Sequence, residues 1–109
     1  MLGTLRGMTS LPPKGYPDPP AEPTAFQQAV IEVVRGIPAG VILTYGEVGA
    51  EAGYPGSAQA VGNLLRRVPG LPWWRVVPAT GRLYQTHVAT QRPLLEAEGV
   101  RFDDRRILS

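Results

Sequence analysis

Hydrophobic residues recur at helical spacing in the segment that follows Thr24. The sequence Thr24-x-x-Gln27 has the form of a capping box, in which each side chain accepts a hydrogen bond from the backbone N–H of the other residue. Gly36 comes just after the apolar stripe, and glycine at this place commonly ends a helix. The pattern therefore predicts a helix between these residues. Its stripe includes Phe26, Val30 and Val33.

Two short helices are predicted next. A second capping box, Thr44-x-x-Glu47, begins a helix that runs through Ala52 and that Gly53 ends. Ser57 is placed as the N-cap of a third helix, which continues to about Arg67. The apolar positions that face inward on this helix are Val61, Leu64 and Leu65. Two short helices joined by a glycine-containing turn are typical of a helix-turn-helix.

The spacing of hydrophobic residues changes after the third predicted helix. Residues 73–77 form a β-prone run between turn signals, and residues 82–84 form a second short run. We expect these runs to be two strands joined by a turn, which would make a small wing. The elements together predict a mainly α fold, a winged-helix-like helix-turn-helix domain with a short β wing.

A last helix is predicted from about Thr90 to Glu98. Pro93 is tolerable in its first turn, and Gly99 stands at its C-cap. The remaining residues, 100–109, either add an edge strand or stay loose.

Composition divides the chain into two parts. Six of its twelve prolines fall within residues 1–23, and proline prevents regular secondary structure there. We therefore expect residues 1–23 to be a disordered segment and residues 24–109 to form one domain. No stretch approaches the roughly 20 apolar residues that span a bilayer, so we expect no membrane contact and a cytoplasmic location. We also expect the protein to be a monomer.

Cysteine is absent from all 109 residues. This excludes a disulfide framework, a zinc site made of thiolates and a cysteine nucleophile. The lone His87 has no neighbouring metal-ligating residue in the sequence, so we expect no metal site and no cofactor.

The formal net charge is only +2, but the basic residues are unevenly distributed. Residues 52–95 contain five arginines and no Asp or Glu, with tryptophan and tyrosine interleaved. Such a segment is typical of a surface that binds nucleic acid, although a solvated face beside an aromatic core has the same composition.

In a helix-turn-helix the second helix contacts DNA, and here that is the helix from Ser57 to Arg67. Its non-core positions are small or polar, which lets the backbone approach DNA closely, and two arginines at its far end can bind phosphates. The candidate DNA-binding residues on this helix are Ser57, Ala58, Gln59, Ala60, Gly62, Asn63, Arg66 and Arg67.

Several sequence pieces between Ile37 and Gly99 resemble, in order and in spacing, the DNA-binding domain of O6-alkylguanine-DNA alkyltransferases. The resemblance is to their non-catalytic relatives in particular, the alkyltransferase-like proteins. The pieces are Ile37-Pro38-x-Gly40, Thr44-Tyr45-Gly46-Glu47-Val48, Gly53-x-Pro55, Ala60-Val61-Gly62, Pro72-Trp73-Trp74-Arg75-Val76-Val77, Gly81, and Leu94-Leu95-Glu96-Ala97-Glu98-Gly99.

The resemblance implies that this chain is not an enzyme. The alkyltransferases carry Pro-Cys-His-Arg-Val, whose cysteine takes the alkyl group; Trp73 stands at the cysteine position and Trp74 at the histidine position. An indole is neither a nucleophile nor a base at neutral pH. Glu98 matches the family's glutamate and is left a structural role, as acceptor for an indole N–H, for Arg75 or for a backbone group.

The resemblance also implies a pocket that receives a base turned out of the duplex. Tyr45 matches the tyrosine that crowds the target phosphate, and Gln59 stands where the family has an arginine that fills the vacated space. We expect Trp73 to line the pocket, whereas Trp74 either lines it or packs behind it. The residues assigned to the lesion pocket are Tyr45, Trp73, Trp74, Arg75, Val76 and Tyr84.

The function implied is binding of double-stranded DNA that contains O6-alkylguanine, through the minor groove. The damaged base would be flipped into the Trp-walled pocket and kept without loss of its alkyl group, which would mark it for nucleotide excision repair proteins of the UvrA type. The alternative is a winged-helix transcription regulator that reads sequence and ignores the lesion. Residues 1–23 would be a tail or a remnant of the further domain that full alkyltransferases carry.

Overall fold

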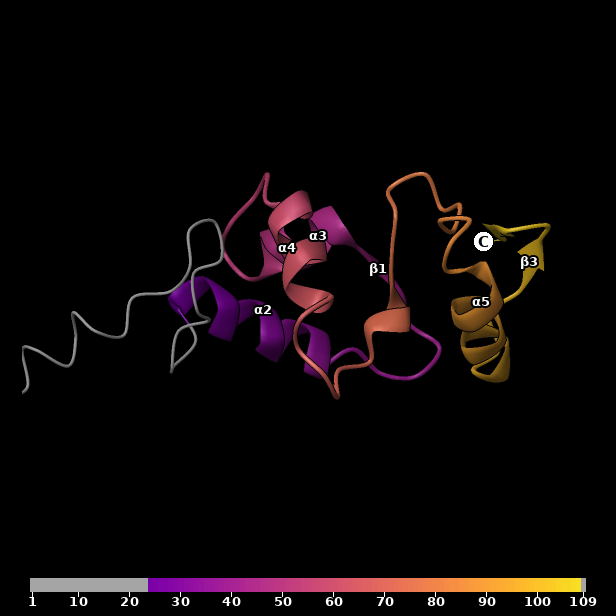
Figure 1. The fold of residues 1–109 in the computed structure, drawn as a ribbon, viewed down its shortest axis with the longest axis horizontal. Helices are drawn as coiled ribbons and strands as arrows, with labels where there is room; N and C mark the ends of the chain where they lie inside the picture. Colours follow the sequence, from indigo (N-terminus) through magenta and orange to yellow (C-terminus); the bar gives the residue numbers. More distant parts are fainter. Residues whose placement is uncertain (1–23, 109) are drawn as a thin grey trace, which may run out of the picture.

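The computed structural model describes residues 24–108. They form four α-helices: α2 (Ala25–Arg35), α3 (Tyr45–Glu51), α4 (Ala58–Leu65) and α5 (Val88–Ala97), together with one 3-10 helix, η1 (Trp73–Arg75). The strands are short: β1 (Leu43–Thr44), β2 (Val76–Val77), β3 (Phe102–Asp103) and β4 (Arg106–Ile107). The fold is mainly α, as predicted (Figure 1). Residues 1–23, for which disorder is predicted, lie outside the described residues.

Both capping boxes form as the sequence predicts. The Thr24 hydroxyl accepts from Gln27 N at 3.1 Å, and the Gln27 side chain accepts from Thr24 N at 2.9 Å. The corresponding distances between Thr44 and Glu47 are 3.0 and 2.7 Å. Each box involves residues three apart in sequence, so the start of the helix is decided locally. Gly36 ends α2, as predicted.

The start of α4 corrects the prediction for Ser57. This residue occupies the N-cap position, but its hydroxyl donates to Tyr54 O at 2.6 Å instead of capping the helix. Its backbone (φ −106°, ψ 23°) departs from the extended conformation that aims an N-cap side chain at the first helical N–H groups. The helix ends at Leu65, two residues before its predicted end at about Arg67.

The predicted strand–turn–strand wing is wrong. Residues 73–75 form η1, and β2 pairs in parallel with β1, with Leu43 opposite Val76 and Thr44 opposite Val77. Both residues of β2 are almost fully buried, which favours a parallel strand covered on both faces over a solvent-exposed hairpin. Residues 82–84 form no strand with them; Arg82 makes an isolated bridge to Arg106.

The last helix begins at Val88, two residues before its predicted start, so Pro93 lies inside α5 and not in its first turn.

The C-terminal residues are ordered as the antiparallel hairpin β3–β4, in which Phe102 is opposite Ile107. The guanidinium of Arg92, on α5, lies 5.2 Å from the ring centre of Phe102. This cation–π contact fixes the hairpin to the helix.

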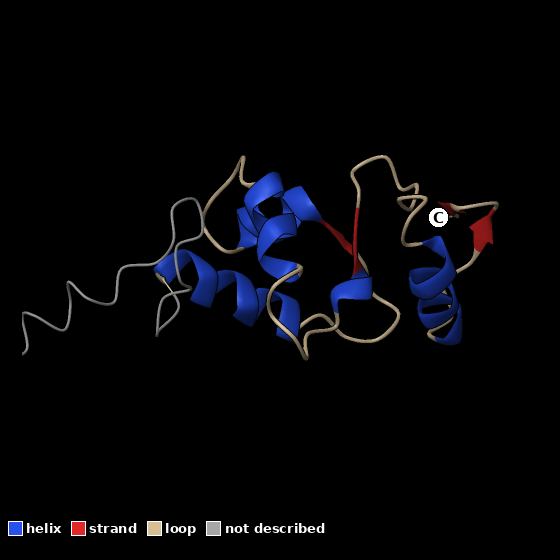
Figure 2. Ribbon diagram, in the orientation of Figure 1, coloured by secondary structure: helices blue, strands red, loops and turns tan. Residues whose placement is uncertain are grey.

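Two clusters of buried residues make up the core. In Figure 2 the helices accordingly lie in two groups, α2 to α4 on one side and α5 on the other. One lies among α2, α3 and α4, and the other lies beneath α5 and the C-terminal hairpin. Val76 belongs to the first cluster and Val77 to the second. Because successive side chains of a strand point to opposite faces, β2 joins the two clusters.

Gly49 sets the packing distance between α3 and the turn before α4. A Cβ atom at this position would lie 2.2 Å from the Ser57 hydroxyl and 3.1 Å from Tyr54 O. We expect Gly49→Ala to lower the free energy of unfolding by about 1–3 kcal/mol, measured by urea denaturation.

Gly46 provides the matched control on the same helix, because the nearest atom to its added Cβ is Thr44 Oγ1, at 4.0 Å. Gly46→Ala should raise stability by about 0.5–1 kcal/mol, since alanine favours helix. Equal effects of the two substitutions would contradict the packing argument.

Candidate nucleic-acid interface

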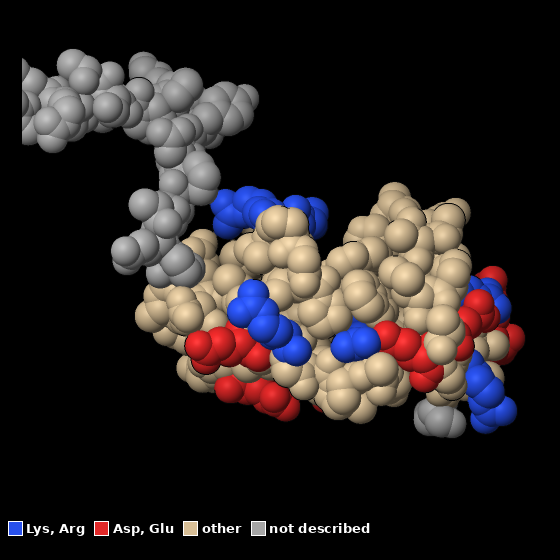
Figure 3. Space-filling view, turned by 90° about the horizontal axis from the view of Figure 1, so that it is seen from below, with Lys and Arg blue, Asp and Glu red and all other residues tan. Residues whose placement is uncertain are grey.

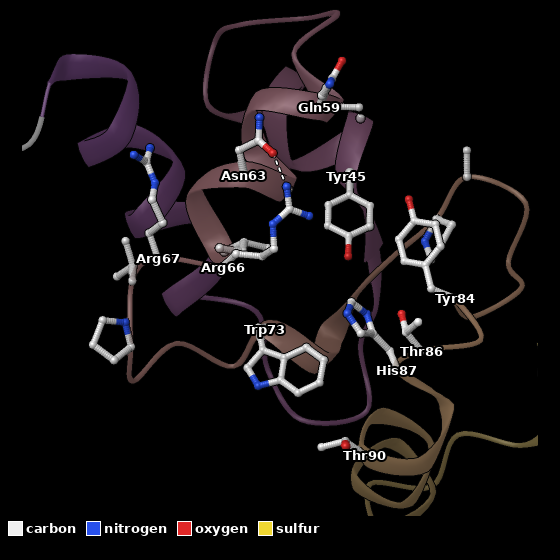
Figure 4. Close-up of a pocket in the computed structure, with 18 of the residues that line it drawn as sticks. Tyr45, Gln59, Asn63, Arg66, Arg67, Trp73, Tyr84, Thr86, His87 and Thr90 are labelled. Carbon is white, nitrogen blue, oxygen red and sulfur yellow. Dashed lines mark hydrogen bonds between the residues drawn. The ribbon is translucent and has the colours of Figure 1, made fainter. Parts of the chain in front are cut away.

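A cleft of about 1350 Å³ lies between the helix-turn-helix and the segment that leads into α5. Tyr45 and α4 line one side, Trp73 of η1 lines the floor, and residues 84–90 line the other side (Figure 4). Drug-sized ligands typically occupy about 300–1000 Å³. The cleft therefore has room for a nucleobase and part of the backbone that carries it.

Four aromatic rings gather in this cleft. The ring centres of Tyr45 and Tyr84 are 6.2 Å apart and tilted by 31°. The His87 ring is 5.7 Å from Trp73 and 5.7 Å from Tyr84, in edge-to-face arrangements with both. Tyr84 is 50% exposed, so one of these rings is open to an incoming group. Flat apolar faces of this kind are suited to stacking on a base.

A cation faces the aromatic rings from α4. The guanidinium of Arg66 donates a hydrogen bond to the Asn63 side chain, which holds it near Tyr45 (Figure 4). Burial raises the pKa of Tyr45, the neighbouring Tyr84 raises it further, and the charge of Arg66 opposes them. Tyr45 thus keeps its proton at neutral pH, and its hydroxyl can both donate and accept a hydrogen bond.

The structure brings most of the predicted DNA-binding residues to the cleft. Ser57 and Ala60 are not part of its lining; Ser57 is half-buried in the turn before α4, and Ala60 is exposed. The predicted residues that line the cleft are Tyr45, Ala58, Gln59, Gly62, Asn63, Arg66 and Arg67. Gln59 lies at the end of this group that is farthest from Trp73 (Figure 4).

The lesion-pocket prediction is corrected for three residues. Tyr45, Trp73 and Tyr84 line the cleft, but Trp74, Arg75 and Val76 do not. In η1 the two tryptophans diverge, with ring centres 6.2 Å apart and planes nearly perpendicular. Trp74 packs into the cluster beneath α5 and lies behind the cleft wall formed by Trp73. Val76 is fully buried in the core.

Glu98 connects three parts of the chain behind the cleft. Its carboxylate accepts from Trp74 Nε1 at 3.1 Å, from Arg75 at 2.6 Å and from Gly40 N at 3.1 Å. Arg75 also donates to Ile37 O at 2.7 Å. Glu98 thus accepts from all three kinds of donor that the sequence allowed. These bonds tie η1 to the end of α5 and to the loop before β1.

The hydrogen bond from Arg75 chiefly lowers the pKa of Glu98, from 4.5 to about 2, and the bonds from Trp74 and Gly40 add to this effect. A carboxylate with a lowered folded-state pKa stabilises the fold above its unfolded-state pKa. That stability is lost as the pH falls from about 4.5 toward 2. We expect Glu98→Gln to be less stable than the wild type at pH 7, and the difference in unfolding free energy to shrink across this window.

Glu96→Gln is the control, because Glu96 is an exposed partner of Arg92. Its difference from the wild type should be small at every pH. Urea denaturation at a series of pH values measures both differences. A gap between Glu98→Gln and the wild type that stays constant from pH 5 to pH 2 would contradict the assigned role of the carboxylate.

The five arginines of residues 52–95 fall into two groups: three form ion pairs, and two form none among residues 24–108. Arg75, Arg82 and Arg92 pair with Glu98, Asp104 and Glu96. Arg66 and Arg67 line the cleft and form no ion pair within residues 24–108. Figure 3 accordingly shows basic and acidic side chains mixed on the face seen from below. Within residues 52–95, the two arginines without an ion pair therefore lie together just after α4 and line the cleft.

Sequence reasoning missed several residues of the site. Thr90 and the loop 68–70 line the cleft without having been predicted. Thr86 and His87 belong to the loop that the resemblance places at the border of the pocket, and both line the cleft. Gln91, on α5, is 1% exposed and donates to the carbonyls of Trp74 and Val76. No local pattern marks it, because its partners lie 17 and 15 residues away.

None of the helices within residues 24–108 is long and apolar enough to span a membrane. In the same residues, His, Asp and Glu side chains form no group of three that could hold a metal ion.

Comparison with known proteins gives consistent matches. A 43% identical relative, over 81 residues, is the DNA base-flipping protein of Escherichia coli; the match covers 70% of this chain and 63% of the relative. The methylated-DNA–protein-cysteine methyltransferase of Methanothermobacter thermautotrophicus is 42% identical over 82 residues, covering 71% of this chain and 46% of that protein. The chain thus spans less than two thirds of the length of either relative.

Among solved structures, S. pombe Atl1 in complex with damaged DNA containing O6-carboxymethylguanine superposes with a TM-score of 0.65. It is 32% identical, and the match covers 70% of this chain and 77% of Atl1. The family model that describes the 6-O-methylguanine DNA methyltransferase DNA-binding domain matches residues 25–100, which include every helix described above. The resemblance read from the sequence motifs is thereby confirmed, and the chain belongs to the family of the 6-O-methylguanine DNA methyltransferase DNA-binding domain.

Proposed function

We propose that this protein binds duplex DNA that contains O6-alkylguanine, receives the extruded base in the cleft and holds it without removing the alkyl group. The observation that carries the proposal is the position of Trp73, on the floor of a cleft that also contains Tyr45, Tyr84 and His87. This is the residue that the motif places where the alkyltransferases have their nucleophile. Relatives that are named base-flipping proteins, and a similar structure bound to alkylated DNA, support it.

The energetics favour retention of a damaged base. Extruding a base from the duplex costs a few kcal/mol, and this cost is smallest where pairing is already weak, as it is for an alkylated guanine. Stacking on an aromatic face returns about 1–3 kcal/mol per base. Trp73 and Tyr84 offer such faces in one cleft. A damaged guanine would therefore enter the cleft more readily than an intact one.

Alkyl transfer needs an activated nucleophile, and the chain lacks the thiol that this family uses. The carboxylate that would orient an activating base, Glu98, is instead occupied by Trp74, Arg75 and Gly40. The cleft therefore supplies binding groups and no group that could accept the alkyl carbon by thiolate attack. Binding without turnover is the behaviour we propose.

Contact with the duplex would come from α4 and from the two arginines that follow its last residue. Arg66 and Arg67 form no ion pair within residues 24–108 and can bind phosphates. Gln59 carries both an amide donor and an acceptor at the far end of the cleft, so it can pair with the base left without its partner. Loss of phosphate contacts would weaken binding to damaged and undamaged DNA alike.

Two duplexes that differ only in one guanine or O6-methylguanine test the proposal. We expect affinity for the lesion duplex to be higher by about 5- to 150-fold, the range given by one stacked base. Mass spectrometry of the protein after incubation should show no added methyl group. Equal affinities for the two duplexes would instead favour a transcription regulator that reads sequence, and a methylated protein would show an alkyltransferase.

We further propose that the persistent complex marks the lesion for nucleotide excision repair. The family resemblance supports this step, because a protein that holds an alkylated base without repairing it requires a second activity to remove it. Incision of the lesion duplex by purified excision-repair proteins should increase when this protein is added. Unchanged or reduced incision would overturn the step and leave lesion binding untouched.

A further inference from the structure

His87 is the one polar ring of the cleft to which nothing above assigns a role. It belongs to the segment that leads into α5 and lines the cleft opposite α4. Its ring stands edge-to-face against Trp73, with planes at 68°, and against Tyr84, with planes at 79° (Figure 4). The imidazole is thus held between the two rings that are the best candidates to stack on a base.

The backbone of His87 fixes where this ring can go. Its N–H donates to Tyr84 O at 2.9 Å, and its carbonyl accepts from the N–H groups of Thr90 and Gln91 at 3.0 and 2.7 Å. His87 occupies the N-cap position of α5, yet its side chain makes no capping hydrogen bond. The backbone of His87 is therefore held in place, and the imidazole makes no bond to the helix that follows it.

The two nitrogens of the ring differ in accessibility. His87 Nδ1 is sealed from solvent and has no hydrogen-bond partner among residues 24–108, so a group that enters the cleft does not reach it. Nε2 is not among the sealed atoms. A neutral imidazole has one N–H donor and one acceptor nitrogen, and Nε2 is the one that is open to a ligand.

We propose that His87 forms a hydrogen bond in the plane of the extruded base, with the edge of an O6-alkylated purine, and that this bond supplies part of the preference for the lesion. The inference rests on the proposed function. Trp73 and Tyr84 would contact a base mainly through their ring faces, and stacking on a ring face depends little on which base is stacked. A ring nitrogen held beside those faces can distinguish one purine edge from another, because base edges differ in their donors and acceptors.

The substitution His87→Phe keeps a ring against Trp73 and Tyr84 and removes both nitrogens. We expect affinity for the O6-methylguanine duplex to fall about 5- to 10-fold, the value of one hydrogen bond, while affinity for the undamaged duplex stays within about twofold. Gln85→Ala, at an exposed residue of the same segment that does not line the cleft, is the matched control and should leave the preference unchanged.

A second measurement needs no variant. The chain contains a single histidine, so the imidazole nitrogen signals in an NMR spectrum belong to His87 alone. Saturation with the O6-methylguanine duplex should shift them, whereas the undamaged duplex should not. If the wild type shows no preference for the lesion, the proposed function fails. If it shows one, but His87→Phe retains it in full and the imidazole signals do not move, only the role of His87 is overturned.

Discussion

Trp73→Ala is expected to abolish most of the preference for alkylated DNA. Removing the indole takes away the main stacking surface on the floor of the cleft, which is worth about 1–3 kcal/mol, or about 5- to 150-fold in affinity for the lesion duplex. Binding to undamaged DNA should change little, because it depends on phosphate contacts made from α4. Fluorescence anisotropy titrations with the paired duplexes measure both affinities. Trp73→Phe, which keeps an aromatic face, should retain part of the preference.

Trp74→Phe is the matched control in the adjacent position. Trp74 packs beneath α5 and donates to Glu98, but it does not line the cleft. The substitution should therefore reduce stability by about 1 kcal/mol, the value of a lost hydrogen bond, and leave the preference for the lesion within about twofold. If Trp74→Phe lost the preference and Trp73→Ala kept it, the assignment of the two tryptophans would be reversed.

Gln91→Leu is expected to produce the largest loss of stability. The Gln91 amide donates to Trp74 O at 3.0 Å and to Val76 O at 3.1 Å, within a side chain that is 1% exposed. Leucine fills a similar volume but leaves both carbonyls without this donor, at about 1–3 kcal/mol each. Burial of the more apolar side chain offsets about 1 kcal/mol. We expect a net decrease of about 1–5 kcal/mol in unfolding free energy.

Gln28→Leu is the control for Gln91→Leu, because it makes the same substitution at an exposed position. Gln28 is exposed on α2, where its amide makes one long hydrogen bond to Glu32 at 3.4 Å. The same substitution should there change stability by no more than about 0.5 kcal/mol. Urea denaturation of the two variants gives the comparison, and similar values for both would show that the two carbonyls do not depend on Gln91.

The resemblance predicted that Trp73 lines the pocket, but it left open whether Trp74 lines the pocket or packs behind it. Trp73 and Trp74 are adjacent, and the direction of the second indole cannot be read from the sequence. Their directions follow from η1 and from the donors that gather around Glu98, which lies 24 residues beyond Trp74. The β-prone sequence of residues 73–77 was misleading, because strand propensity says nothing about the partner of a strand.

The arginines of residues 52–95 are a second case in which the sequence could not distinguish similar residues. The five arginines look equivalent in sequence, since no acid lies among them. Folding brings carboxylates from the C-terminal part of the chain to Arg75, Arg82 and Arg92 and leaves Arg66 and Arg67 at the cleft. Of the five arginines that the composition indicates for a nucleic-acid surface, only Arg66 and Arg67 therefore lie at the cleft without an ion pair among residues 24–108.

The sequence by itself determined the beginnings of α2 and α3 and the absence of a thiol. Capping boxes join residues three positions apart, and composition does not depend on folding. Only the tertiary structure decided that β2 pairs with β1, that His87 stands between Trp73 and Tyr84, and that Glu98 holds Arg75. These contacts join residues that are distant in sequence, or depend on the directions of side chains, and no local pattern encodes either.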